Sequence, residues 1–201
     1  EYLKFCKKIA KKYKCKEIVH IGDLVDNHVT SHWGLDPDGR SAIDELQLAK
    51  QSIKEWHKAF PKMKVCIGNH SRRIEKTLLK AGVTTSWLKS YNTVYDIPES
   101  DWEFRDHFIV DGIRFTHGDG NTSISSASKR ALNLNQSIVS GHQHSKAVIQ
   151  YLRAGEIFSM IIGCGIDDST YAFNYARDYA DRSVLSCGVI VDGLPIIEIM
   201  K

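Results

Sequence analysis

Four short apolar runs, each ending in a small cluster of polar residues, constrain what this chain can fold into more than any other feature. The clusters are Gly22-Asp23-Leu24-Val25-Asp26, Gly68-Asn69-His70, Thr116-His117-Gly118-Asp119 and Gly141-His142-Gln143-His144. In layered α/β folds, the loops that follow neighbouring strands converge on one edge of the sheet, and functional sites gather there. We therefore expect the four clusters to lie close together in space.

The segments around these clusters alternate between helical and extended patterns. The apolar periodicity predicts helices over residues 3–13, 42–60, 72–80 and 123–134, and short strands over residues 17–21, 63–67 and 137–140. Two hairpins are predicted over residues 108–116 and 184–199, where Asp111-Gly112 and Asp192-Gly193 are strong turn signals. This order favours an α/β fold with a mixed sheet, or two packed sheets, covered by helices.

Length and composition are typical of one globular domain spanning residues 1–201. Hydrophobic residues make up 42% of the chain and charged residues 25%, and no apolar run approaches the roughly 18 residues that a membrane helix needs. The five cysteines have no C-x-x-C spacing, so we expect neither a disulfide framework nor a structural zinc site, and a reducing, cytoplasmic setting. Cys66 and Cys187 lie in apolar runs and are interpreted as small core residues.

Positive charge is concentrated at the beginning of the sequence. The net charge of +3 is too small to indicate a nucleic-acid partner by itself. A solvated helix face would explain the lysines of this segment, and so would a patch that attracts a polyanionic substrate. The lysines are Lys4, Lys7, Lys8, Lys11, Lys12, Lys14 and Lys16.

The residue types in the four clusters suit a site that binds two metal ions and hydrolyses a phosphate ester. Two ions roughly 3.5–4 Å apart activate a water and neutralise the phosphoryl oxygens. Asp23 can bridge both ions because a carboxylate has two oxygens. Neutral donors can complete the shells, namely Asn69, His117, His142 and His144. Mixed nitrogen and oxygen ligation suits Mn²⁺, our first candidate, as well as Fe or Zn²⁺.

The order of the clusters resembles the calcineurin-like metallophosphoesterase family, whose pattern runs D-x-H, G-D-x-x-D, G-N-H-[D/E], H and G-H-x-H. All blocks except the first are matched over about residues 17–145. The resemblance implies a mixed β-sandwich flanked by helices, two divalent metal ions and phosphoric ester hydrolysis. It implies that Asp23 bridges the ions, that Asn69, His117 and His142 bind one of them, and that His144 binds the other.

The resemblance also implies a catalytic role for His70, which would face the substrate and either donate to the phosphoryl group or protonate the leaving oxygen. Asp26 would hold the imidazole ring of His70. Further polar residues near these blocks are candidate substrate contacts, although loop polarity or a solvated helix face would also explain them. They are His28, His32, Arg72 and Arg73.

The sequence departs from the family pattern in two places. Ser71 stands where the family has Asp or Glu, and we interpret it as a cap of the following helix. No D-x-H precedes Gly22, because residues 1–16 contain neither Asp nor His. We expect an upstream strand that carries D-x-H, since the first helix has no strand before it. A degenerate site is the alternative.

Several functions are compatible with these residues. The leading hypothesis is a phosphodiesterase acting on nucleotides or nucleic acid. A phosphomonoesterase or protein phosphatase is the alternative because these reactions use the same metal core, although Asn27-His28 replaces the Arg-Gly of the family's protein phosphatases. A non-catalytic protein-binding scaffold on the same fold is a third possibility. No membrane partner is expected, and the sequence does not indicate the oligomeric state.

Overall fold

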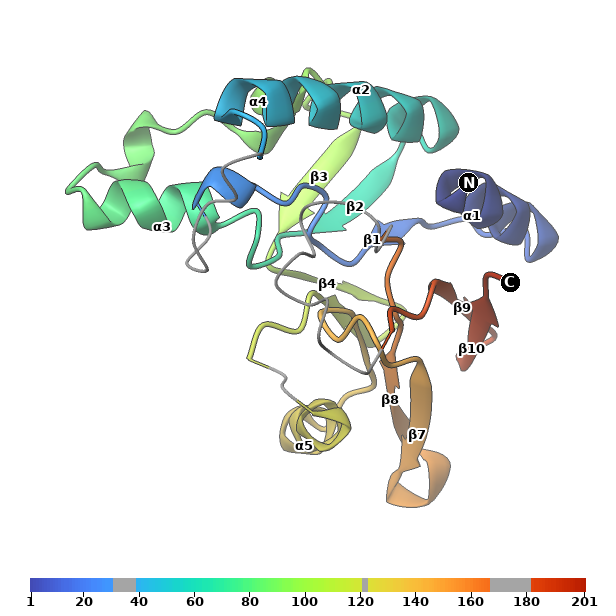
Figure 1. Ribbon diagram of the computed structural model, residues 1–201. Coiled ribbons are helices and arrows are strands. Elements are labelled where there is room, and N and C mark those ends of the chain that lie inside the picture. Colours follow the sequence, from blue (N-terminus) through green and yellow to red (C-terminus); the bar gives the residue numbers. More distant parts are fainter. Residues whose placement is uncertain (31–38, 121–122, 167–181) are drawn as a thin grey trace.

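Three β-sheets and the helices that flank them make up the fold in the computed structural model, which describes residues 1–30, 39–120, 123–166 and 182–201 (Figure 1). The predicted α/β class is therefore confirmed. The helices are α1 (Tyr2–Lys12), α2 (Ala42–Ala59), α3 (Arg73–Lys80), α4 (Tyr91–Tyr95) and α5 (Ile124–Leu134), with short 3₁₀ turns η1 (His28–Thr30), η2 (Thr85–Trp87) and η3 (Arg153–Gly155).

The first sheet is parallel and has the strand order β1-β2-β3. Its strands are β1 (Val19–His20), β2 (Met63–Cys66) and β3 (Trp102–Arg105). Parallel neighbours need long crossover connections, and helices supply them: α2 joins β1 to β2, while α3 and α4 lie between β2 and β3. Because β1 and β2 run in the same direction, the polar clusters that follow them lie at the same edge of the sheet.

The second sheet is mixed and has the order β4-β5-β6-β8-β7. Its strands are β4 (His107–Val110), β5 (Ile113–Thr116), β6 (Ile138–Ser140), β7 (Val148–Leu152) and β8 (Ile157–Ile161). Strands β5, β6 and β8 are mutually parallel, and α5 covers one face of the sheet with the fully buried Ala127 and Ala131. Every residue of β6 is buried, as expected for a central strand covered on both faces.

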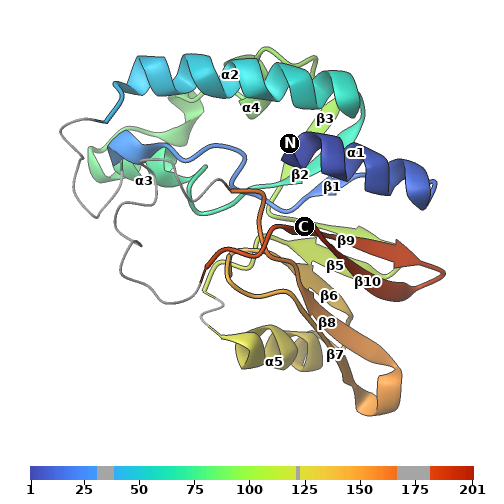
Figure 2. The same cartoon turned by 45° about the vertical axis from the view of Figure 1, so that its right-hand side comes forward.

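A hairpin of β9 (Ser186–Val191) and β10 (Leu194–Ile199) forms the third sheet (Figure 2). It packs against the second sheet, where Ile190 and Ile197 join a hydrophobic cluster around Val139 and Met160. Asp192 and Gly193 both have positive φ at the turn, as do Asp111 and Gly112 between β4 and β5. Both predicted hairpins are confirmed, because Asp-Gly readily adopts a turn with two positive φ angles.

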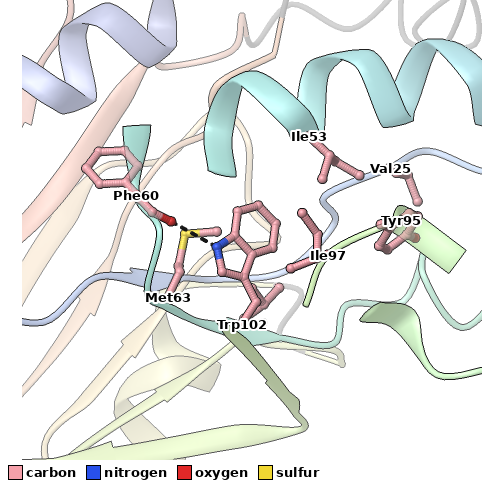
Figure 3. Packing of buried hydrophobic residues seen from close by; sticks show 8 residues of the cluster. Val25, Ile53, Phe60, Met63, Tyr95, Ile97 and Trp102 are labelled. Carbon is pink, nitrogen blue, oxygen red and sulfur yellow. Dashed lines mark hydrogen bonds between the residues drawn. The ribbon is translucent and has the colours of Figure 1, made fainter. Parts of the chain in front are cut away.

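The main hydrophobic core lies between the first sheet and the helices that cover it (Figure 3). Ile53 from α2, Val65 from β2 and Trp102 from β3 are each 1% exposed. The indole Nε1 of Trp102 donates a hydrogen bond to the carbonyl of Phe60, 2.9 Å away, so the one polar atom of this ring is satisfied in the core. In the described parts of the chain, no helix combines the length and the apolar character needed to cross a bilayer.

We predict that Trp102→Ala lowers the free energy of unfolding by about 3–5 kcal/mol, because it empties a large core volume and leaves the Phe60 carbonyl without its donor. Trp87→Ala is the matched control: its ring is 82% exposed, so we expect a change within about 0.5 kcal/mol. Urea unfolding followed by circular dichroism measures both. Equal losses in the two variants would contradict this description of the core.

Candidate metal centre

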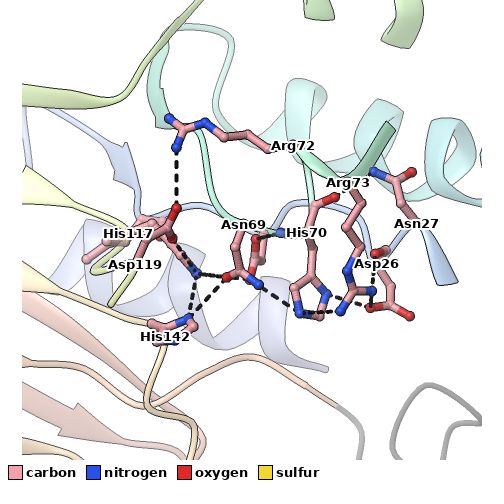
Figure 4. A network of polar contacts seen from close by, with 11 residues as sticks. Asp26, Asn27, Asn69, His70, Arg72, Arg73, His117, Asp119 and His142 are labelled. Atoms are coloured by element: carbon pink, nitrogen blue, oxygen red, sulfur yellow. Dashed lines mark hydrogen bonds and ion pairs between the residues drawn. The ribbon is translucent and has the colours of Figure 1, made fainter. Parts of the chain in front are cut away.

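Side chains from the loops that follow β1, β2, β5 and β6 come together in one polar network, which includes Asp26, Asn69, His117 and His142 (Figure 4). Among the hydrogen bonds that join these loops, two are made by His117. The imidazole of His117, which follows β5, bonds through Nδ1 to the carbonyl of Ile21 at 2.8 Å. The carbonyl of His117 accepts from the backbone N–H of Gly141 at 3.0 Å. The expected convergence of the four polar clusters therefore occurs between two sheets and not along the edge of one.

Four potential ligand atoms come together at this junction, and each lies within 3.2 Å of at least one of the others. His117 Nε2 is 2.9 Å from both Asp23 Oδ2 and Asn69 Oδ1. His142 Nδ1 is 3.1 Å from Asn69 Oδ1 and 3.2 Å from His117 Nε2. Donors that share one divalent ion at about 2.1 Å are themselves about 3 Å apart. The spacing and the donor types therefore fit a metal ion, and Asp23, His117 and His142 form a candidate metal-binding group.

The ring of His117 is fixed in the orientation that a ligand needs. It is 3% exposed, and the hydrogen bond from Nδ1 to Ile21 leaves the Nε2 lone pair directed at the cluster. Gly22 allows this ring to approach, since a Cβ at Gly22 would lie 2.7 Å from His117 Nδ1. Sequence reasoning missed the part played by Ile21, because a backbone carbonyl has no side-chain signature.

A backbone hydrogen bond orients the carboxylate of Asp23, and the absence of a side chain at Gly68 leaves space for it. Its Oδ1 accepts from the backbone N–H of His70 at 2.9 Å, while Oδ2 faces His117. A Cβ at Gly68 would lie only 2.1 Å from Asp23 Oδ1. Asp23 and His142 both have left-handed backbones, with φ of 50° and 68°. Such strained conformations are often found at functional sites.

The contact between Asp23 and His117 favours the charged form of each group. Burial by itself would raise the pKa of Asp23, but the hydrogen bond and the charge of His117 outweigh it and bring this pKa to about 2. Burial would likewise lower the pKa of His117, and the Asp23 carboxylate raises it above its ordinary value. Burial, together with the nearby charge of His117, lowers the pKa of His142 and so favours the neutral imidazole that can bind a metal.

His70 lies beside these atoms without belonging to the ligand group. Its Nδ1 is 2.6 Å from Asp26 Oδ1, which is the contact that the family resemblance implies. Its Nε2 is 3.0 Å from Nη2 of Arg73 and 3.9 Å from Asp23 Oδ2. One edge of the ring is thus held by the carboxylate of Asp26, while the other edge contacts Arg73 and lies 3.9 Å from the candidate ligand Asp23.

Of the candidate substrate contacts, which are Arg73, Arg72, His28 and His32, those that the structure describes differ in how close they lie to the site. Arg73 Nη1 donates to the carbonyl oxygen of Asp26 at 2.9 Å and to its Oδ1 at 3.1 Å, so this guanidinium lies beside the site. Arg72 is paired with Asp106 and with Asp119, whose Oδ1 lies 3.7 Å from His117 Nε2, so its guanidinium is held at the edge of the site by two carboxylates. The backbone N–H of His28 donates to Glu45 at 3.0 Å. His32 lies outside the described residues.

The structure corrects the prediction that Ser71 caps the helix that follows it. Ser71 does not cap α3: the N-cap position is Arg72, no side chain caps this helix, and Ser71 is buried. The chain makes a further turn before the helix begins, so Ser71 packs inward.

His144 does not belong to the converging group of Asp23, His117 and His142. Its carbonyl accepts from the N–H of Val184 at 2.8 Å, and burial lowers the pKa of its ring.

Comparisons with known proteins give one structural match. No protein-family model and no curated protein matches the chain. Among solved structures, a single-site mutant of Vps29 from Entamoeba histolytica is matched at 14% sequence identity over 91% of this chain and 97% of that chain, with a TM-score of 0.36. Proposals about the activity of this chain therefore rest on its own residues.

We predict that Gly68→Ala weakens Mn²⁺ binding by about tenfold or more, because the added methyl group collides with Asp23 Oδ1 and displaces a ligand. Gly141→Ala is the matched control next to His142. A Cβ there meets its nearest neighbour at 3.7 Å, an ordinary contact, so binding should change little. Isothermal titration calorimetry measures both affinities. Unchanged affinity in Gly68→Ala would contradict the assignment of Asp23 as a ligand.

Proposed function

We propose that this chain is a metal-dependent hydrolase of phosphate esters, and more narrowly a phosphodiesterase acting on nucleotides or nucleic acid. The observation that carries the proposal is the pairing of His70 with Asp26 directly beside the four converging donor atoms. A site that only bound a metal would not need a second histidine held in this way. When bound, the ion would supply positive charge for the phosphoryl oxygens and lower the pKa of a water.

Four residues would hold that ion. Asp23 Oδ2, Asn69 Oδ1, His117 Nε2 and His142 Nδ1 provide one carboxylate and three neutral donors. This set leaves net positive charge at a divalent ion, which suits an anionic substrate. A second ion would have Asp23 and His144 as protein ligands, and we propose that it binds more weakly. Mn²⁺ is our first candidate for this mixture of oxygen and nitrogen donors.

His70 would deliver a proton to the leaving oxygen. Arginine has only donors to offer, so the contact with Arg73 makes Nε2 the acceptor and places the ring proton on Nδ1, toward Asp26. To act as an acid, Nε2 must be protonated and face the substrate, which requires Arg73 to turn away. A phosphoryl oxygen is a suitable new partner for this guanidinium. Arg73 therefore fits a phosphate contact better than Arg72, which is occupied by Asp106 and Asp119.

The lysine-rich face of α1 supports a polyanionic substrate. The seven lysines of this first segment are exposed. Two of them have acidic partners, since Lys4 pairs with Glu1 and Lys12 with Glu198. The remainder add positive charge at one side of the first sheet, which would attract a phosphate backbone. This observation favours a nucleic-acid diester over a small monoester.

A non-catalytic protein-binding scaffold is the second candidate function. One observation favours it: large apolar side chains on α3 and η2 are exposed, with Trp87 82% exposed, Leu79 50% and Ile74 44%. Exposed apolar groups of this size often mark protein-interaction sites. The two candidates differ in one measurable property, because a scaffold can bind metal at Asp23 and His117 without turning over a phosphate ester.

We predict that the protein hydrolyses a bis-aryl phosphate diester in the presence of Mn²⁺, and that His70→Ala lowers turnover by about 10²-fold or more with metal content unchanged. This is the usual scale for losing a positioned acid. His57→Ala is the matched control, since His57 also pairs with an aspartate, Asp101 at 2.8 Å, but lies on α2. Its turnover should remain near wild type.

Steady-state rates and metal analysis of the same preparations provide the test. Loss of metal in His70→Ala would show that His70 is a ligand and not the acid. A wild-type protein that binds Mn²⁺ at the predicted residues, yet turns over neither diester nor monoester, would support the scaffold instead.

A further inference from the structure

Helix α1 lies against the third sheet, and polar contacts tie the two together near both ends of the helix (Figure 2). The hydroxyl of Tyr2 donates to the carbonyl of Ser186 at 2.7 Å. At the other end, the hydroxyl of Tyr13 and the ammonium of Lys12 contact Glu198 Oε1 at 2.5 and 2.6 Å. One face of α1 therefore runs along β9 and β10.

Cys6 lies on this face of α1. It follows Tyr2 by four residues and precedes Tyr13 by seven, so the three side chains share one side of the helix. Both tyrosines reach the hairpin. Cys6 therefore lies between two neighbours that are anchored to the hairpin, while it also packs against the core of the first sheet.

Cys187 faces Cys6 from the hairpin. It is directly opposite Glu198 in the antiparallel pairing of β9 and β10, and directly opposite residues project their side chains to the same face. Glu198 contacts α1 through Lys12 and Tyr13, so Cys187 points toward α1 as well. It also follows Ser186, the residue to which Tyr2 is bonded.

We propose that Cys6 and Cys187 are a redox-active thiol pair that a hydroperoxide converts into a disulfide between α1 and β9. Both are free thiols and neither is fully buried. The pair is distinct from the candidate metal centre and does not depend on the proposed hydrolase activity. The sequence indicated no disulfide, because 180 residues separate the two positions and only the fold brings them together.

The electrostatics favour attack by Cys6. The neighbouring thiol of Cys187 lowers the pKa of Cys6, whereas the neighbouring thiol of Cys6, together with burial, raises the pKa of Cys187. Cys6 therefore ionises first, and the thiolate is the reactive form. By contrast, burial raises the pKa of Cys66 to about 12, and burial also raises the pKa of Cys15.

The reaction balances with one hydroperoxide. The Cys6 thiolate attacks a peroxide oxygen, the O–O bond breaks, and Cys6 becomes a sulfenic acid while the other oxygen leaves as hydroxide and takes a proton to become water. The sulfur of Cys187 then attacks the sulfur of Cys6, forming the S–S bond and releasing the sulfenic oxygen as a second water. Two thiols are oxidised and one hydrogen peroxide is reduced to two waters.

The disulfide would constrain a segment that reaches the candidate metal centre. Strand β9 begins shortly after Val184, whose N–H is bonded to the carbonyl of His144. The backbone of Cys164 accepts from Ser186 and donates to Val184. Fixing β9 to α1 would therefore also fix the chain that supports His144.

Exposure of the full chain to hydrogen peroxide followed by non-reducing peptide mapping tests the proposal. We expect a peptide containing Cys6 linked to one containing Cys187, a fall in free thiols from five to three, and full reversal by dithiothreitol. This readout uses the unaltered protein, so it does not depend on whether a cysteine variant folds. Absence of the linked peptide after the thiols have been oxidised, or a linkage between other cysteines, would overturn the proposal.

Two matched variants sharpen the result. Cys6→Ser should abolish the intramolecular link, because it removes the thiol that reacts first with the peroxide. Cys187 should then react slowly with the peroxide. Cys15→Ser removes a neighbouring thiol of the same segment and should leave the link intact. If Cys15→Ser loses the link while Cys6→Ser keeps it, Cys6 is not the reactive thiol. Circular dichroism of each variant establishes that it is folded.

Discussion

The contact between Asp23 and His117 is the interaction on which the arrangement of the candidate site depends. Asp23 follows a strand of the first sheet, and His117 follows a strand of the second. Two oppositely charged groups that are buried together in this way stabilise each other, whereas either one alone would bear the desolvation cost of an unpaired charge. A divalent cation can replace the proton on His117 and compensate the same carboxylate, so the contact is also the place where a metal would enter.

The backbone around this contact is shaped to permit it. Gly22 and Gly68 leave no room for a side chain beside His117 and Asp23. Asp23, Asn27 and His142 have left-handed backbones, which costs free energy for residues with a Cβ. Two packed hydrophobic clusters, one that contains Trp102 and one that contains Val139, support the strands that precede these residues. The site is therefore preorganised by packing that lies outside it.

Much of the fold could be predicted from local pattern, and the misses have physical reasons. The Asp-Gly turns identified both hairpins, and helical periodicity located α1, α2, α3 and α5. Strand β3 was missed because its extended form depends on pairing with β2 and on burial of Trp102, which are long-range effects. The pair β7 and β8 was missed because Arg153–Gly155 connects them without an Asp-Gly turn. Motif spacing indicated Asp23, Asn69, His117 and His142, but the orientations of Arg72 and Arg73 follow from partners distant in sequence.

Diffraction from crystals grown with Mn²⁺, recorded at the manganese absorption edge, would show directly whether an ion occupies the candidate metal centre. We expect an anomalous peak within about 2.0–2.3 Å of Asp23, Asn69, His117 and His142, with the Asp23–His117 hydrogen bond replaced by bonds to the ion. A crystal that takes up Mn²⁺ elsewhere, while His117 keeps its hydrogen bond to Asp23, would contradict the metal centre and the hydrolase built on it.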